Sequence, residues 1–210
     1  MKRSLLILIV LSVSVLSVAL SACFYSYMPC PAIYYDSVEE LEARLPDFYY
    51  FDDFTIETTL QSCFSSSDEW VKTAYQDYSE VHFNSYTIYY DIPEKENENY
   101  FLINCHEIKE GASSENVASA DSDTSYAINI DGIECFFATK LSEYEGYRTV
   151  TMGIGFNIEN CYYNIILYQT QKNSTSENEP FNYEYTLDDF PEMVTPAIIN
   201  RHKGGETNVL

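Results

Sequence analysis

The strongest folding signal in this chain is the stretch Tyr126-Ala127-Ile128-Asn129-Ile130-Asp131-Gly132-Ile133-Glu134-Cys135-Phe136-Phe137. Asp131-Gly132 suits a two-residue hairpin turn of type I′, because both central residues of that turn need a positive φ. Around this turn we predict the cross-strand pairs Ile130 with Ile133, Ile128 with Cys135, and Tyr126 with Phe137. All of these side chains would lie on one face, so the turn and the hydrophobic alternation predict the same register.

A second hairpin is predicted further along the chain, with Glu159-Asn160 as its turn. Its predicted pairs are Ile158 with Cys161, Phe156 with Tyr163, Ile154 with Ile165, and Met152 with Leu167. The opposite face carries Gly153 and Gly155, and glycines in a strand let another group approach the backbone closely. Either a helix or a ligand could occupy that space, and we expect a helix.

Helices are predicted near both ends of the folded part. Ser37-Val38-Glu39-Glu40 has the pattern of a capping box, which predicts a helix from Val38 to Leu45 that stops at Pro46. Thr186 is expected to cap a last helix, which Pro196 should kink.

The other strands are predicted from runs of aromatic and β-branched residues. They are expected near residues 55–60, 82–92 and 100–108, with polar loops at 62–68, 93–99, 111–125 and 172–180. The predicted fold class is α+β. It has an antiparallel meandering β-sheet of about six or seven strands, with an N-terminal and a C-terminal helix packed on the sheet.

The first 22 residues have the order of a secretory signal peptide. Lys2 and Arg3 precede an apolar run that is short for a membrane-spanning helix, which needs about 20 residues. The segment Leu20-Ser21-Ala22-Cys23 resembles the lipobox of bacterial lipoproteins. That resemblance implies cleavage before Cys23 and a diacylglycerol on its thiol. Cys23 is therefore the one site residue that we predict, as the site of lipidation.

This resemblance implies an extracytoplasmic protein of the cell envelope, anchored to the cell membrane by acyl chains such as palmitate. Each buried CH₂ group contributes about 0.8 kcal/mol, so two or more chains hold firmly where one does not. An uncleaved anchor helix, or a plain signal peptide with an unrelated cysteine, is the alternative. The expected organisation is a signal peptide at 1–22, a lipid anchor and tether at 23–35, one domain at 36–200 and a flexible tail at 201–210.

The chain is strongly acidic, with 33 Asp and Glu residues against 11 Lys and Arg residues. Removal of Lys2 and Arg3 with the signal peptide takes the formal net charge from −22 to −24. Such a surface repels nucleic acid and anionic lipid headgroups, and it admits cationic partners. The more ordinary interpretation is that the acidity keeps an exposed domain soluble.

The mature chain has an odd number of cysteines besides the lipidation site, namely Cys30, Cys63, Cys105, Cys135 and Cys161. An oxidising compartment permits disulfides, but five cysteines cannot all pair within one chain. No pair has the spacing of a zinc site. We expect buried free thiols, because the last three lie in apolar, strand-like surroundings. One disulfide between neighbouring strands is the alternative.

No catalytic constellation stands out in the sequence. His82 and His106 could meet across adjacent strands, but we expect ordinary strand histidines. Cys105 and His106 are neighbours in a strand and therefore point to opposite faces. Asp121-Ser122-Asp123-Thr124-Ser125 begins like a calcium loop but lacks the later glycine and glutamate. We therefore expect no enzyme activity, no metal site and no cofactor.

Aromatic residues are abundant, with 20 tyrosines and 12 phenylalanines. Tyr49-Tyr50-Phe51 and the tyrosines Tyr86, Tyr89 and Tyr90 could form an exposed aromatic surface, but we expect them in the core. An exposed aromatic surface with acidic neighbours could bind sugars or cationic peptides.

The order of these elements resembles an uncharacterised extracytoplasmic domain of Firmicutes lipoproteins and anti-sigma-like membrane proteins. The features that carry the resemblance are the Ser37-Val38-Glu39-Glu40 helix with its proline stop, the stretch Ile130–Phe137 and the strand Cys161–Ile165. The resemblance implies a non-catalytic binding or sensor module for a protein or cell-wall glycan, with no nucleic-acid partner. The alternatives are a secreted hydrolase with an undetected site and a passive structural lipoprotein.

Overall fold

The computed structural model describes residues 28–29, 32–67, 70–71, 82–93, 98–108, 123–144, 146–172 and 181–205. The expected signal peptide, the lipidation site Cys23, Cys30 and most of the loop expected at 111–125 lie outside the described residues. The chain divides into two compact units, Met1–Ala32 with Ser66–Phe83, and Ile33–Ser65 with Asn84–Leu210. In the first unit, β1 (Met28–Pro29) pairs antiparallel with β5 (Trp70–Val71).

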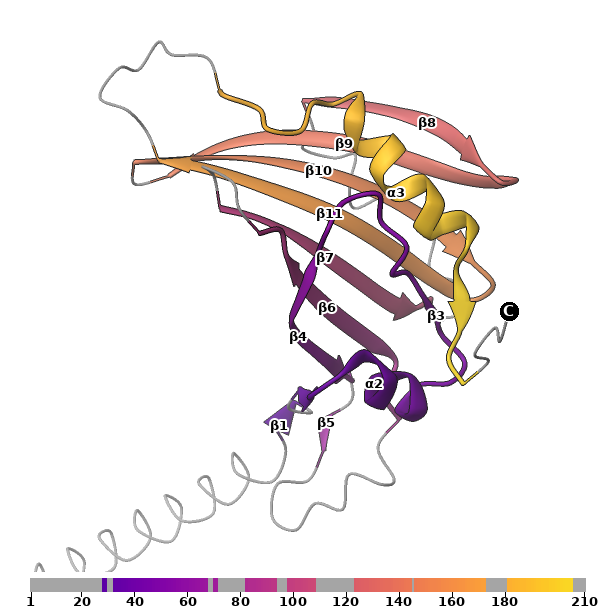
Figure 1. Cartoon of the computed structure of the whole chain (residues 1–210). Coiled ribbons are helices and arrows are strands. Elements are labelled where there is room, and N and C mark those ends of the chain that lie inside the picture. The colour runs from indigo at the N-terminus through magenta and orange to yellow at the C-terminus, as the bar shows by residue number, and fades with distance from the viewer. Residues whose placement is uncertain are drawn as a thin grey trace, which may run out of the picture. The chain divides into compact units, whose positions relative to one another are not determined.

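The second unit is built on one mostly antiparallel sheet of eight strands, in the order β2-β4-β6-β7-β11-β10-β9-β8 (Figure 1). The strands are β2 (Ile33–Tyr35), β4 (Thr59–Ser66), β6 (Ser85–Asp91), β7 (Glu98–Glu107), β8 (Thr124–Ile130), β9 (Ile133–Tyr144), β10 (Tyr147–Ile158) and β11 (Cys161–Lys172). The expected count of six or seven strands is therefore too low. The expected loop at 62–68 was wrong as well, because β4 continues through it to Ser66.

Both predicted hairpins are confirmed residue by residue. Asp131 and Gly132 have φ angles of 51° and 81°, as a type I′ turn requires. In β8–β9, Ile130 pairs with Ile133 and Tyr126 with Phe137. In β10–β11, the predicted pairs recur from Ile158–Cys161 through Met152–Leu167. Local turn chemistry and period-two alternation therefore specify these registers.

Two α-helices occur in the described residues. Helix α2 (Val38–Arg44) begins where predicted, and the side chain of Ser37 accepts a hydrogen bond of 3.3 Å from the Glu40 N–H. Helix α3 (Asp189–Ile199) is preceded by a reciprocal cap. The Asp189 N–H donates to Thr186 Oγ1, and the Thr186 N–H donates to Asp189 Oδ2. The capping role predicted for Thr186 is thus confirmed.

Helix α3 lies across one face of the sheet, which we call the inner face (Figure 1). Phe190 of α3 packs against the rings of Phe101 and Phe137, with centroids 6.3 and 5.9 Å away. The segment between α2 and β4 also enters this core, where the Phe51 ring meets Phe156 and Tyr163 edge-on. The inner face is therefore closed by side chains from both ends of the unit.

The chain after α3 stays ordered beyond its expected end. Residues 202–203, expected in a flexible tail, instead form β12 (His202–Lys203), which pairs with β3 (Tyr49–Tyr50). The pairing is reinforced by His202, whose Nε2 lies 2.7 Å from Glu42 Oε1 of α2. A strand from a distant part of the same chain therefore holds this segment in place, and sequence periodicity does not reveal such a partner.

Candidate functional site

The face of the sheet opposite α3, which we call the outer face, carries the candidate site. Side chains alternate between the faces along each strand. In β7, Phe101, Ile103 and Cys105 are buried on the inner face, while Tyr100 and Asn104 on the outer face are half-buried. Among the described residues, neither helix lies over the outer face (Figure 1).

Five aromatic side chains form a continuous row across five neighbouring strands of the outer face. We call this set the aromatic row: Tyr34 of β2, Phe64 of β4, Tyr89 of β6, Tyr100 of β7 and Tyr168 of β11. From Tyr34 to Tyr168, successive ring centroids are 5.1, 6.4, 6.3 and 4.7 Å apart. Each contact lies in the range for favourable aromatic pairs, so the row packs as one unit.

The rings of the aromatic row turn toward one another rather than toward solvent. Tyr100 and Tyr168 stack with only 14° between their planes, and Phe64 and Tyr89 stack with 28° between theirs. Within the row, each of these four rings is stacked against a neighbour, and Tyr34, at one end of the row, is 68% exposed. A partner reaching the middle of the row meets ring edges and phenol hydroxyls.

The phenols of Tyr100 and Tyr168 stay protonated at neutral pH. Burial raises the pKa of Tyr100, and its neighbours Tyr168 and Tyr89 add to the rise. Burial and the neighbouring Tyr89 raise the pKa of Tyr168 in the same way. Within the described residues, the hydroxyls of Tyr89, Tyr100 and Tyr168 have no hydrogen-bond partner. They can therefore donate to a bound partner.

Acidic side chains border the aromatic row. Asp91 at the end of β6 is paired with Tyr100 across the strands, and it is exposed. Glu98 precedes Tyr100 by two residues in β7, lies on the same face and is also exposed. The rim of the row therefore combines negative charge with phenol donors.

A polar band lies beside the row, nearer the other end of the strands. Thr87 Oγ1 donates a 2.9 Å hydrogen bond to Asn104 Oδ1, and Asn104 is paired with Asn164 of β11. Asn164 Oδ1 and the Tyr162 hydroxyl are buried and have no hydrogen-bond partner among the described residues. These two atoms are the orphaned polar groups of the outer face.

The space above Gly155 is filled by Tyr162 and not by the helix that we expected. Gly153 and Gly155 do lie on the outer face, opposite the face that α3 covers. A Cβ atom on Gly155 would overlap the Tyr162 hydroxyl and ring. Tyr162 in turn packs against the His106 ring, with centroids 5.3 Å apart. The glycine thus serves a neighbouring strand of the same sheet.

His82 and His106 belong to different compact units of the chain. His82 lies outside the strands, whereas His106 is in β7. Burial lowers the pKa of His106 below its usual value. No group of three His, Cys, Asp or Glu side chains in the described ranges is placed to hold a metal ion.

Of the segment 121–125, which begins like a calcium loop but was expected to be an ordinary polar loop, the structure describes only Asp123 and the residues after it. The Asp123 carboxylate accepts a 2.7 Å hydrogen bond from the Leu141 N–H. It therefore closes the end of the β8–β9 ladder as a structural acceptor.

The expectation of buried free thiols is confirmed for Cys105, Cys135 and Cys161, and Cys63 is a buried free thiol as well. Burial raises the pKa of Cys135 to about 11, and burial also raises the pKa of Cys105. Thiols of this kind are mostly protonated and are poor nucleophiles at neutral pH.

Of the aromatic residues proposed as an exposed surface, most belong to the core. Tyr50, Phe51, Tyr86 and Tyr90 are buried, as expected, and only Tyr89 joins the aromatic row. Sequence reasoning missed the rest of the row, because its members come from five separate strands. The sequence signal that could have found the row is the alternation of side chains within each strand, which places Tyr89 and Tyr90 on opposite faces of the sheet.

No protein-family model matches this chain, and neither the curated proteins nor the solved structures contain a significant match. Helices long and apolar enough to cross a membrane are not found in the described part of the chain.

Proposed function

We propose that this protein is an extracytoplasmic binding module, tethered to the cell membrane through lipid on Cys23, that binds a partner protein on its aromatic row. The lipobox-like segment Leu20-Ser21-Ala22-Cys23 supports the proposed location and the lipid anchor. The observation that carries the binding role is the aromatic row on a sheet face that neither described helix covers.

The ring geometry favours a protein over a glycan as the ligand. A sugar ring stacks on an aromatic face that is open to solvent. In this row the faces of Tyr100 and Tyr168 are stacked on each other at 4.7 Å. Tyrosine edges with free hydroxyls instead give a rigid, amphipathic surface at low entropic cost, which is how tyrosine-rich paratopes bind proteins.

The charge of the molecule favours a partner with a basic patch. The chain has a formal net charge of −22, and Asp91 and Glu98 stand at the rim of the row. Complementary potentials speed association and suppress wrong partners. Binding is therefore expected to weaken as salt screens these charges.

Site-specific photocrosslinking in the native membrane tests the binding surface. A photoreactive phenylalanine analogue at Tyr89 should give a defined crosslinked protein, because Tyr89 lies in the middle of the row. The same analogue at Tyr144, which is exposed on the outer face but not in the row, is the matched control. The Tyr89 product should disappear in the double variant Tyr100→Ser, Tyr168→Ser.

A crosslink that is equally strong from Tyr144, or that persists in the double variant, contradicts the proposal. Thermal unfolding of the purified protein with peptidoglycan fragments tests the alternative that the aromatic row binds a cell-wall glycan and not a protein. A ligand that binds only the native state raises the midpoint with its concentration. A rise that the double variant loses would assign the row to a cell-wall glycan instead.

The anchor is tested by Cys23→Ala. We expect this variant to leave the membrane fraction and to lose incorporation of labelled fatty acid, because a thiol is needed to carry the diacylglycerol. Cys30→Ala is the matched control and should remain membrane-bound. Full membrane retention and unchanged labelling of the Cys23→Ala protein would rule out the lipobox interpretation.

A further inference from the structure

Among the described residues, strand β8 is an edge strand of the eight-stranded sheet, because it pairs with β9 on one side and with no strand on the other. Its own sequence lacks the features that usually protect an edge. Its sequence, Thr-Ser-Tyr-Ala-Ile-Asn-Ile, contains no charge and no proline. Natural edge strands are normally kept from pairing by charges, prolines, bulges or short length.

The strand at the opposite edge of the same sheet, β2, does have one of these protections, namely short length. Strand β2 has only three residues, and the Tyr35 hydroxyl is bonded to Ser65 Oγ at 2.7 Å. Strand β8 has seven residues in an unbroken register with β9, from Thr124 opposite Thr139 to Ile130 opposite Ile133. The first four residues of β8 and Asn129 are exposed.

The hairpin geometry identifies the backbone groups that face outward. In a two-residue hairpin, the residues flanking the turn form a hydrogen-bonded pair, and the two kinds of pair then alternate along the ladder. Ile130, Ile128 and Tyr126 therefore direct their N–H and C=O groups to β9. Ser125 and Ala127, like Asn129, direct theirs to the open side of the sheet.

We propose that β8 is a strand-addition site, at which an extended, lysine- or arginine-bearing segment of a partner protein pairs with Ser125, Ala127 and Asn129. Main-chain hydrogen bonds to an exposed sheet edge supply the affinity in this mode of recognition. The site is separate from the aromatic row, and this inference does not depend on the function proposed for that row.

The charges around β8 indicate a basic segment. Asp123 and Asp131 lie at the two ends of the strand. Burial raises the pKa of the Tyr126 phenol, and the negative charge of nearby Asp188 adds to the rise. Arg201 lies 3.7 Å from Asp131 and offsets its charge in part, and Lys140 follows Thr139, the cross-strand partner of Thr124, near the Asp123 end of β8. The three acidic groups Asp123, Asp131 and Asp188 outnumber these two cations.

The same charges disfavour a second copy of this chain as the occupant. An antiparallel pair of β8 strands centred on Ala127 would place Asp123 of each copy opposite Asp131 of the other. Like charges directly opposite each other destabilise a strand pair. Each copy also has a formal net charge of −22, which opposes association further.

The test uses a fluorescent peptide that alternates lysine with valine, N-methylated along one edge so that it cannot form a sheet with itself. Anisotropy titration of the full chain in detergent should show saturable binding. Ala127→Pro should weaken binding about tenfold or more, because proline removes an outward N–H that strand addition uses. The fold should survive, since that N–H is not part of the β8–β9 ladder.

Ala127→Thr is the matched control, because it changes the side chain and keeps the N–H, and it should bind as the native chain does. No saturable binding, or equal binding by Ala127→Pro with an intact circular dichroism spectrum, overturns the proposal. Equal binding of a peptide that alternates glutamate with valine overturns the claim that the partner segment is basic. Dimerisation of the protein itself that Ala127→Pro abolishes would assign the edge to a second copy.

Discussion

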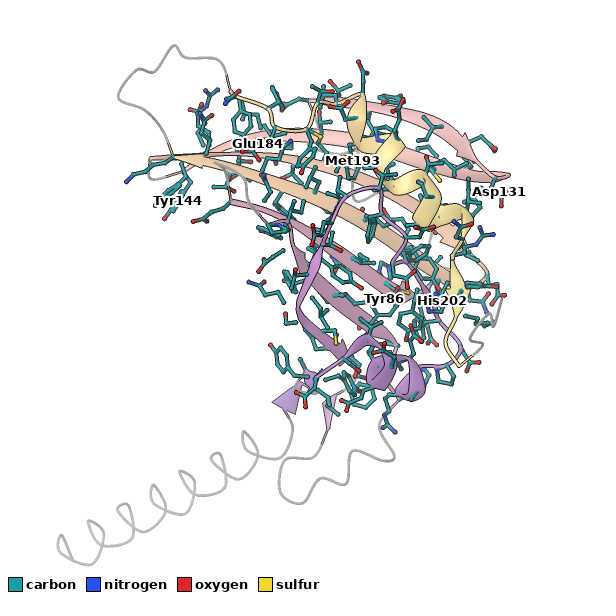
Figure 2. All side chains as sticks on the ribbon, viewed as in Figure 1. Tyr86, Asp131, Tyr144, Glu184, Met193 and His202 are labelled. Atoms are coloured by element: carbon teal, nitrogen blue, oxygen red, sulfur yellow. The ribbon has the colours of Figure 1, made fainter. Side chains whose placement is uncertain are left out.

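Single residues on the outer face show how closely the strands are fitted to one another. Figure 2 shows the side chains of the described residues. Tyr162 is 9% exposed, its hydroxyl has no hydrogen-bond partner among the described residues, and its ring lies over Gly155. A buried hydroxyl without a partner lowers stability. The ring keeps its place because Gly155 leaves it the room.

Gly155→Ala is therefore expected to destabilise the protein by about 1–3 kcal/mol, because the new Cβ forces Tyr162 out of its position. Gly153→Ala is the matched control. A Cβ at Gly153 would lie 3.5 Å from Asn164 Oδ1 and 3.8 Å from Ile166 Cγ1, which are ordinary contacts. Urea unfolding of both variants measures the difference, and equal midpoints would contradict this account of Gly155.

At the scale of elements, α3 is specified by its first turn and by the face that it buries. Phe190, Val194 and Ile198 are fully buried at helical spacing. The reciprocal bonds between Thr186 and Asp189 satisfy N–H groups that the start of a helix leaves without partners. Hydrogen bonding to Thr186 also lowers the pKa of Asp189.

Thr186→Ala is expected to lower the free energy of unfolding by about 1 kcal/mol, the usual cost of losing a capping hydroxyl. Thr186→Ser keeps the hydroxyl and should stay within a few tenths of the native value. Chemical denaturation monitored by circular dichroism measures both. A serine variant as unstable as the alanine variant would show that the threonine methyl group, and not the cap, matters here.

At the scale of the whole molecule, the dominant feature is the excess of negative charge. Like charges repel across the folded surface and disfavour the compact state. With 33 acidic and 11 basic residues, this repulsion is distributed over the entire chain. Single ion pairs such as Lys203 with Glu159, at 3.2 Å and partly exposed to solvent, offset little of this repulsion.

We therefore expect the thermal midpoint to rise as sodium chloride is increased from about 0.01 M to about 1 M, because the Debye length falls from about 30 Å to about 3 Å. Calorimetry at fixed pH measures the change. Sucrose at matched osmolality is the control for non-ionic effects. A midpoint that is constant or falls with salt would show that ion pairing outweighs the repulsion.

The features that could be predicted from the sequence are those that depend on residues close together in the chain. The register of both hairpins followed from two turn residues and from alternation, as at Asp131-Gly132. The strand count did not, because the three-residue strand β2 lies in the segment that we expected to be a tether. The sequence also did not predict the full length of β4, which runs to Ser66 through an expected loop with Ser62 and Ser65. Ser65 is fully buried, and its Oγ lies 2.7 Å from the Tyr35 hydroxyl of the neighbouring strand β2. Propensity cannot foresee such a tertiary partner.

By itself, the sequence determined the features that are local: the two hairpin registers, the caps of α2 and α3, and the buried state of Cys105, Cys135 and Cys161. Only the tertiary structure decided the order of the strands, which brings β7 against β11 and leaves β8 at the edge. That order assembles the aromatic row from Tyr34 to Tyr168. A turn and a two-residue period act over a few residues, whereas strand order depends on which buried faces pack together across the whole chain.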